Sequence, residues 1–236
     1  MPNPINFAVL TASNSHISGN NDQIFGDNNT LDLTYSTIDG DGNKVFGYHD
    51  VVMGDGNTVL GKYNIVVGTN NGLSGDNGIV HGDHNFVYGN NEIVVGNFGN
   101  ITFDSTEKGL NHTTVQGSSN TIMIGNDEIL SVIGDSNTIN IKGSATINFA
   151  AGNQLETLDL RHAFDFYKFG EASVANINHT DTILVGPGES WKVITIPTKV
   201  PGLFDRELVV HDSQGATFDV HFGNVSLEAI HVVQHD

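Results

Sequence analysis

The sequence predicts an all-β fold, in which a parallel β-solenoid is followed by a small, mainly β C-terminal domain. Residues 12–102 form thirteen consecutive seven-residue units of the pattern G-D-x-N-x-V-x, without an insertion. The sixth position of every unit is aliphatic, and Gly opens eleven of the thirteen units. A single aliphatic residue, usually β-branched, before a Gly- and Asn-rich turn is typical of one short strand in a solenoid coil.

A coiled coil is the usual interpretation of a seven-residue period, but two features exclude it. A coiled coil needs two apolar positions in each heptad, whereas only the sixth position is reliably apolar here. Each Gly would also cost a helix about 1 kcal/mol. The aliphatic column that we expect to fill the solenoid core consists of Ile17, Ile24, Leu31, Ile38, Val45, Val52, Val59, Val66, Leu73, Val80, Val87, Val94 and Ile101.

The fifth position shows that two units make one coil. From Lys44 onward this position is aliphatic in every second unit, so we expect two strands and two turns in each fourteen-residue coil. Because the sixth position points inward, the fifth and seventh positions point outward. One outer face is therefore apolar, and an exposed apolar face marks an interaction site. We expect self-association through Val51, Met53, Ile65, Val67, Ile79, Ile93 and Val95.

The chain divides into three predicted parts. Residues 1–11 are expected to form a cap strand, because the end of a solenoid exposes unpaired backbone. The solenoid spans residues 12–151, with regular heptads over 12–102 and longer, irregular coils over 109–151. Residues 152–236 form the mainly β domain, with a short helix left open for 155–169. Its expected strands are 182–185, 192–196, 207–210, 217–222 and 229–233.

The composition limits which partners the protein is expected to bind and where in or outside the cell it is expected to act. The 236 residues carry a formal charge of −18 and no cysteine. This acidity disfavours nucleic acid and anionic membranes as partners. The N-terminus lacks the basic region of a signal peptide, and no stretch is long enough to span a bilayer. We therefore expect no membrane insertion, and we favour a bacterial protein that is secreted without a cleaved N-terminal signal and acts outside the cell.

Calcium is the one cofactor that the turns leave open. Their carboxylates are ligands of the kind that Ca²⁺ prefers, and the candidates are Asp41, Asp55, Asp76, Asp83 and Asp135. The heptad lacks the nonapeptide arrangement of calcium-binding β-rolls. We therefore expect Asp and Asn to set turn geometry and to stack in hydrogen-bonded ladders, and the solenoid to fold without a cofactor.

Catalysis is not expected, because the chain shows neither a nucleophile motif nor a phosphate-binding loop. Ice binding would need regular Thr columns, and only Thr30, Thr37 and Thr58 approach one. Two functions stay open. The first is a non-enzymatic extracellular structural protein that self-associates as a matrix, fibre or surface-layer subunit through its apolar face and its solenoid ends. The second is a module that binds a polysaccharide or a cell surface, with Tyr167, Phe169 and Trp191 as a stacking platform and the solenoid as a spacer.

The repeat resembles the head repeat of trimeric autotransporter adhesins over residues 12–102. The matching positions are Gly40, Asn43 and Val45 in one unit and the corresponding residues of its neighbours. This resemblance implies a left-handed parallel β-roll that trimerises through one apolar face, and an adhesive role. The sequence shows no heptad stalk and no membrane anchor, so we do not expect display on a cell surface by that route. Residues 155–164 are similar to tails of bacterial proteins exported by type I secretion.

Overall fold

The computed structural model describes residues 5–102, 111–125, 128–161, 163–164 and 169–234. The described residues are almost entirely β-strand and turn, with one short 3-10 helix, η1 (Leu227–Ala229). The predicted parallel β-solenoid is confirmed. Two compact units make up the chain: unit 1 is residues 1–102, and unit 2 is residues 103–236. No helix among the described residues has the length and hydropathy needed to cross a membrane.

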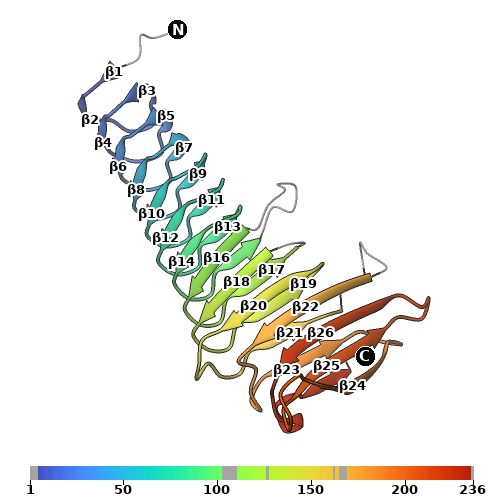
Figure 1. The fold of residues 1–236 in the computed structure, drawn as a ribbon. Helices are drawn as coiled ribbons and strands as arrows, with labels where there is room; N and C mark the ends of the chain where they lie inside the picture. Colours follow the sequence, from blue (N-terminus) through green and yellow to red (C-terminus); the bar gives the residue numbers. More distant parts are fainter. Residues whose placement is uncertain (1–4, 103–110, 126–127, 162, 165–168, 235–236) are drawn as a thin grey trace. The chain divides into compact units, whose positions relative to one another are not determined.

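Unit 1 consists of two parallel sheets, and the chain alternates between them (Figure 1). The strands of sheet A are, in order, β1 (Ile5–Asn6), β3 (His16–Asn20), β5 (Thr30–Thr34), β7 (Lys44–Tyr48), β9 (Thr58–Leu60), β11 (Gly72–Ser74), β13 (Phe86–Tyr88) and β15 (Asn100–Thr102). The strands of sheet B are β2 (Val9–Thr11), β4 (Gln23–Phe25), β6 (Thr37–Asp39), β8 (Val51–Met53), β10 (Ile65–Val67), β12 (Ile79–His81) and β14 (Ile93–Val95).

The register of unit 1 has the predicted period of fourteen residues. Val66 pairs with Val52 on one side and with Val80 on the other. The same register extends upstream of Ala12, because Leu10 pairs with Ile24 and Ile5 with Gly19. Residues 5–11 therefore form a coil of their own next to β3 and β4, at the position where the cap strand was expected over residues 1–11.

The core of unit 1 is the predicted aliphatic column. Ile17 keeps 7 % of its surface exposed, and the other twelve members keep at most 2 %. The flanking fifth and seventh positions of each strand are half-buried or exposed, as in β8, where Val52 is buried between Val51 and Met53. The core is thus a single file of side chains between two sheets, which explains how a chain with few apolar residues folds.

The third position of every unit adopts a left-handed backbone conformation, a feature that the sequence analysis did not identify. Its φ angle is positive in all thirteen units, from 52° at Asn14 to 66° at Gly42 and Gly56. Asn and Gly tolerate this conformation best, and they fill eight of the thirteen positions. Tyr35, Tyr63 and Phe98 adopt it with bulky side chains, so their strain must be offset by other contacts.

The fourth position forms a buried hydrogen-bonded ladder along each side of unit 1. The Asn43 N–H donates to Oδ1 of Asn57 at 2.7 Å, and the Asn57 N–H donates to Oδ1 of Asn71 at 2.7 Å. The second ladder joins the Ser36 N–H to Asp50 and the Asp50 N–H to Asn64. Each side-chain oxygen therefore satisfies a buried backbone donor of the preceding coil, which a turn alone would leave without a partner.

Unit 2 continues the two-sheet pattern with longer coils. Its sheet A contains β17 (Thr121–Ile124), β19 (Thr138–Ile141), β21 (Thr157–Asp159), β23 (Thr182–Val185) and β27 (Val232–Gln234), all parallel. Its sheet B contains β16 (Asn111–Gln116), β18 (Glu128–Ile133), β20 (Ala145–Phe149), β22 (Phe169–Ala175), β26 (Thr217–Gly223), β25 (Phe204–His211) and β24 (Ser190–Pro197). Only the last two pairings, β26 with β25 and β25 with β24, are antiparallel.

The expected domain boundary at Gly152 does not coincide with a break in the sheets. Leu158 pairs in parallel with Ile139 on one side and with Ile183 on the other, so the solenoid continues past Gly152. Within 155–169, where a short helix was left open, the described residues contain β21 and no helix. The expected strand at 229–233 begins only at Val232, because Ala229 belongs to η1. The fourth-position ladder also continues, since the Asn137 N–H donates to Oε2 of Glu156 at 2.9 Å.

Replacing Asn71 with Ala tests the ladder. This change removes the acceptor of the Asn57 N–H and the donor, at 3.0 Å, to the Gly54 carbonyl oxygen. Two buried backbone groups lose their partners, so we expect a loss of about 2–5 kcal/mol in the free energy of unfolding. Urea unfolding followed by circular dichroism measures the loss. The control is Asn70→Gly at the exposed left-handed position next door, for which we expect a change within about 0.5 kcal/mol; equal effects of the two variants would contradict the ladder's role.

Candidate interaction surface

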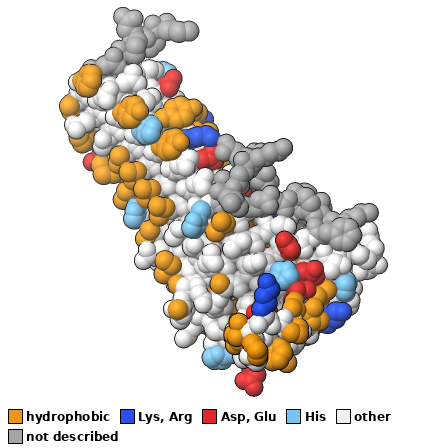
Figure 2. Space-filling model, viewed as in Figure 1, with side chains coloured by type: hydrophobic (Ala, Val, Ile, Leu, Met, Phe, Trp, Pro, Cys, Tyr) orange, Lys and Arg blue, Asp and Glu red, His pale blue; other side chains and the backbone are white. Residues whose placement is uncertain are grey.

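The strands β8, β10, β12 and β14 place the predicted interface residues on one outer face of unit 1. Each strand buries its central Val and turns its two flanking side chains outward. The seven residues form the apolar face, which Figure 2 shows as hydrophobic side chains along the edge of unit 1. The apolar face consists of Val51, Met53, Ile65, Val67, Ile79, Ile93 and Val95.

Strand pairing arranges the apolar face in two straight columns. Ile65 pairs with Val51 and Ile79, and Ile79 pairs with Ile93. Adjacent side chains of a column are therefore about 4.8 Å apart, close enough to cover each other's sides. Ile93 is 46 % exposed and Val67 is 41 % exposed, whereas the other five members are half-buried. His81 is the one polar member of the second column, and it is exposed.

Charged side chains are kept off the apolar face. The eight outward positions of β8, β10, β12 and β14 contain no Asp, Glu, Lys or Arg, in a chain with 27 acidic and nine basic residues. Asp39 of β6, the next strand of sheet B toward the N-terminus, is a charged and exposed residue on the same outer face. A partner that covers these eight positions would therefore bury neither a carboxylate nor an ammonium group, which removes the largest cost of forming a contact.

The outer face of sheet A in unit 1 is mixed. Lys44 and Phe46 of β7 lie together, with the ammonium group 5.1 Å from the ring centroid. Thr58 and Ser74 are exposed polar residues, whereas Phe86 is exposed by 53 %. Polar, aliphatic and aromatic side chains alternate there, and the charged ones are Asp32 of β5 and Lys44 of β7, so this face offers no continuous apolar area.

Aromatic rings stack along one row of turns in unit 1, which sequence analysis missed. The ring centroids of Tyr35 and His49 are 4.7 Å apart, and those of His49 and Tyr63 are 4.9 Å apart, with nearly parallel planes. All three occupy the left-handed third position, fourteen residues apart. The fourteen-residue spacing of these rings can be read from the sequence once the left-handed third position is known. Their stacking offsets part of the backbone strain at that position.

The candidate calcium ligands serve as hydrogen-bond acceptors in separate turns. Oδ1 of Asp41 accepts from the Asp55 N–H at 2.7 Å, and Oδ1 of Asp55 accepts from the Thr69 N–H at 2.7 Å. Asp83 and Asp135 accept from the N–H groups of later turns in the same way. Asp76 accepts from the Asn90 N–H at 3.0 Å and pairs with Lys62. Within the described part of the chain, no three His, Asp or Glu side chains are grouped to hold a metal ion.

The predicted stacking platform is described only in part. Trp191 lies on β24 and is 41 % exposed. Tyr167 and the side chain of Phe169 lie outside the described residues. The platform therefore stays a prediction.

Asp50 and Glu92, two carboxyl groups of the second ladder, keep 0 % of their surface exposed. Burial raises the pKa of Asp50 to about 6, although the Ser36 N–H donates to its Oδ1 at 2.8 Å. Burial raises the pKa of Glu92 to about 8, with a hydrogen bond from the Gly78 N–H opposing the shift and Asp76 adding to it. A Cβ at Gly78 would lie 2.5 Å from Oε2 of Glu92. The missing side chain at Gly78 thus makes room for the longer side chain at the next ladder position.

The comparisons with known proteins concern mainly unit 1. Residues 4–96 match the model of a grass antifreeze β-roll family. Searches of curated proteins and of solved structures found no match. The family match supports the β-roll repeat, but it supports neither the adhesin head nor the type I secretion tail in the resemblances drawn from the sequence. Together with the solenoid, it points to a non-enzymatic structural or surface-binding protein.

Replacing Asp50 with Asn should stabilise the protein at neutral and alkaline pH. Folding raises the pKa of Asp50 from 3.8 to about 6. The folded state therefore binds more protons than the unfolded state between these values, and stability falls as the pH rises through this window. In the Asp50→Asn variant, the new amide would face the Leu33 carbonyl oxygen, as the Asn64 amide donates to that of Gly47.

We expect Asp50→Asn to gain about 1–3 kcal/mol above pH 6, with the gain shrinking as the pH falls toward 4. Urea unfolding at a series of pH values measures it. Asp55→Asn, on an exposed turn, is the matched control and should show no such dependence. A gain for Asp50→Asn that is the same at every pH would contradict the role of its carboxylate charge.

Proposed function

We propose that the protein is a non-enzymatic structural protein whose copies associate through the apolar face. The observation that supports this most is the exclusion of charge from eight consecutive outward positions in a chain of charge −18. A second copy is the simplest occupant, because a flat apolar face can pack on itself about a two-fold axis. Fully burying one aliphatic side chain contributes about 1.5–3 kcal/mol. Seven partly exposed ones on each copy outweigh the repulsion between acidic chains, which salt screens beyond about 8 Å.

Association at the N-terminal end of the solenoid would extend such pairs into larger assemblies. Phe7 is 81 % exposed and Val9 is 69 % exposed in the first coil, and an end strand offers free backbone groups to another strand. The proposal includes a matrix, fibre or surface-layer role outside a bacterial cell. An acidic repeat without cysteine is consistent with that setting.

The double variant Ile65→Asp, Ile79→Asp tests the apolar face. It places two carboxylates at the centre of one column, where pairing would bury them. We expect sedimentation velocity to show a dimer or larger species for the wild type and a monomer for the variant, with unchanged circular dichroism. The matched control is Thr58→Asp, Ser74→Asp on sheet A, which should assemble like the wild type. A wild type that stays monomeric at high concentration would exclude the proposal.

Ice binding is the second candidate, and the family match favours it. The family matched by residues 4–96 is named for antifreeze activity. The apolar face also has a regular spacing of about 4.8 Å along its columns, although Thr37 of the adjoining β6 is its nearest hydroxyl neighbour in the fifth-position column. Ice recrystallisation and thermal hysteresis assays measure this activity. Inhibition by a monomeric wild type, abolished in Ile65→Asp, Ile79→Asp and kept in the sheet A control, would establish ice binding and exclude association as the role of the face.

A further inference from the structure

A groove lined by both polar and apolar side chains crosses the outer face of sheet B in unit 2, and neither the proposed function nor the family match accounts for it. Three adjoining hollows of about 320, 150 and 300 Å³ form the groove. The first two share Thr146 and Ser173, and the last two share Ser144 and Glu171. The hollows are therefore continuous across β20, β22 and β26.

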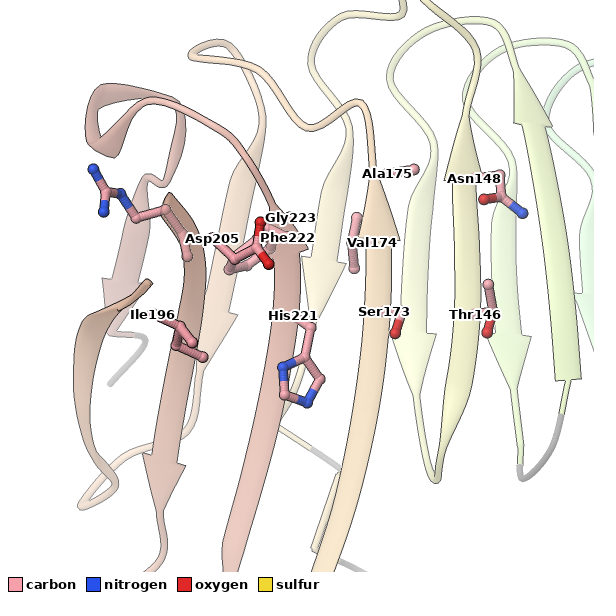
Figure 3. A pocket seen from close by; sticks show the side chains of 11 residues that line it. Thr146, Asn148, Ser173, Val174, Ala175, Ile196, Asp205, His221, Phe222 and Gly223 are labelled. Carbon is pink, nitrogen blue, oxygen red and sulfur yellow. The ribbon is translucent and has the colours of Figure 1, made fainter. Parts of the chain in front are cut away.

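Strand register lines up side chains along the groove. Thr146 pairs with Ser173, Ser173 pairs with His221, and His221 pairs with Glu207. Figure 3 shows Thr146, Ser173 and His221 in one row on the neighbouring strands β20, β22 and β26. Three steps between strands make this row roughly 14 Å long. An elongated ligand could thus contact four strands at once.

Two carboxylates orient His221, which lies in the row between Ser173 and Glu207. Its Nδ1 lies 2.9 Å from Oε2 of Glu207, which is 9 % exposed, and its Nε2 lies 3.8 Å from Oε2 of Glu171. A buried carboxylate behind an imidazole fixes the ring without occupying its second nitrogen. The groove therefore presents a pre-oriented imidazole edge, which lowers the cost of ordering on binding.

Two buried polar atoms at the groove have no hydrogen-bond partner among the described residues. They are Oδ1 of Asp219 and Nε of Arg206. Both residues line the groove, Asp219 in one hollow and Arg206 in another. A buried donor and a buried acceptor without partners call for ordered water, which can bridge them to a ligand in the groove.

The chemistry of the lining distinguishes between ligand classes. Carboxylates of Glu128, Glu171, Asp205 and Asp219 outnumber the single cation Arg206 in the lining. Nη1 of Arg206 donates to Oγ1 of Thr195 at 2.6 Å. This balance disfavours phosphates, acidic polysaccharides and nucleic acid. The remaining polar side chains both donate and accept hydrogen bonds, as hydroxyl groups of a ligand do; they are Ser144, Thr146, Asn148, Ser173 and Thr217.

We propose that this groove binds a segment of a neutral polysaccharide laid across β20, β22 and β26. Sugar hydroxyls match the side chains that donate and accept, and pairs of hydroxyls suit the carboxylates. Ile196, which is 36 % exposed, offers an apolar contact for the C–H face of a ring. The site is separate from the apolar face of unit 1, so the proposal goes beyond self-association and does not depend on it.

The first experiment is affinity electrophoresis of the full chain in native gels. The gels contain dextran, glucomannan, galactomannan or a soluble β-glucan, with alginate and an oligolysine as charged probes. The chain also carries Ile65→Asp and Ile79→Asp, so that assembly does not contribute multivalent binding. We expect at least one neutral polysaccharide to retard it. Retardation by none of them, or by alginate or oligolysine alone, would overturn the proposal.

Three groove variants locate the binding site. Ser173→Phe fills the centre of the row, His221→Ala removes the oriented imidazole, and Asp219→Asn removes a carboxylate. We expect each to weaken binding of the retarding polysaccharide at least tenfold, with an unchanged far-UV circular dichroism spectrum. Thr121→Phe is the matched control, because Thr121 is an exposed hydroxyl residue on a strand of sheet A in the same unit. If folded His221→Ala and Asp219→Asn bind like the wild type and the control, the groove is not the site.

Discussion

The ladder of buried fourth-position side chains is the constraint on which unit 1 depends. Each coil is only fourteen residues long, and half of it is turn, so many backbone N–H groups have no strand partner. Side-chain oxygens such as Oδ1 of Asn57 supply the missing acceptors from the next coil. A shift in register would separate every donor from its acceptor at once. The ladder therefore fixes both the stacking of the coils and the fourteen-residue period. The aliphatic column alone would better tolerate a shift of one coil relative to the next.

Close stacking of the coils sets the remaining rules of the repeat. A Cβ at Gly82 would lie 2.1 Å from the Gly68 carbonyl oxygen of the preceding coil, so the first position must lack a side chain there. The left-handed third position turns the chain, and rings at this position can stack on those of the next coil. With four of seven positions committed to the fold, the fifth and seventh are free to vary. Function in unit 1 is therefore expected on its flat outer faces, where these side chains lie.

The features that could be predicted from the sequence are those that depend on the spacing of residues within one coil. The aliphatic column, the two strands in each coil and the outward direction of residues such as Ile65 all follow from periodicity, and the structure has them. The burial of Asn57 was not foreseen, because a polar residue in a turn is normally solvated. The boundary at Gly152 was placed by composition, whereas pairing of Leu158 with Ile139 and Ile183 depends on register between coils of unequal length. The groove joins Ser173 to His221 through long connections that have no period.

The distribution of acidic residues links stability to the surface that the protein presents. Carboxylates in exposed turns, such as Asp41, accept hydrogen bonds from the next coil at little cost in desolvation, because water still reaches them. In the buried ladder the same group is costly, and burial raises the pKa of Glu92 to about 8. A carboxylate at an outward position of β8, β10, β12 or β14 would stay solvated and would not carry such a cost, yet these eight positions hold none. Folding does not explain that absence, since an exposed charge on a strand destabilises little. The contact that we propose for the apolar face would explain it, because a carboxylate there would have to lose its water.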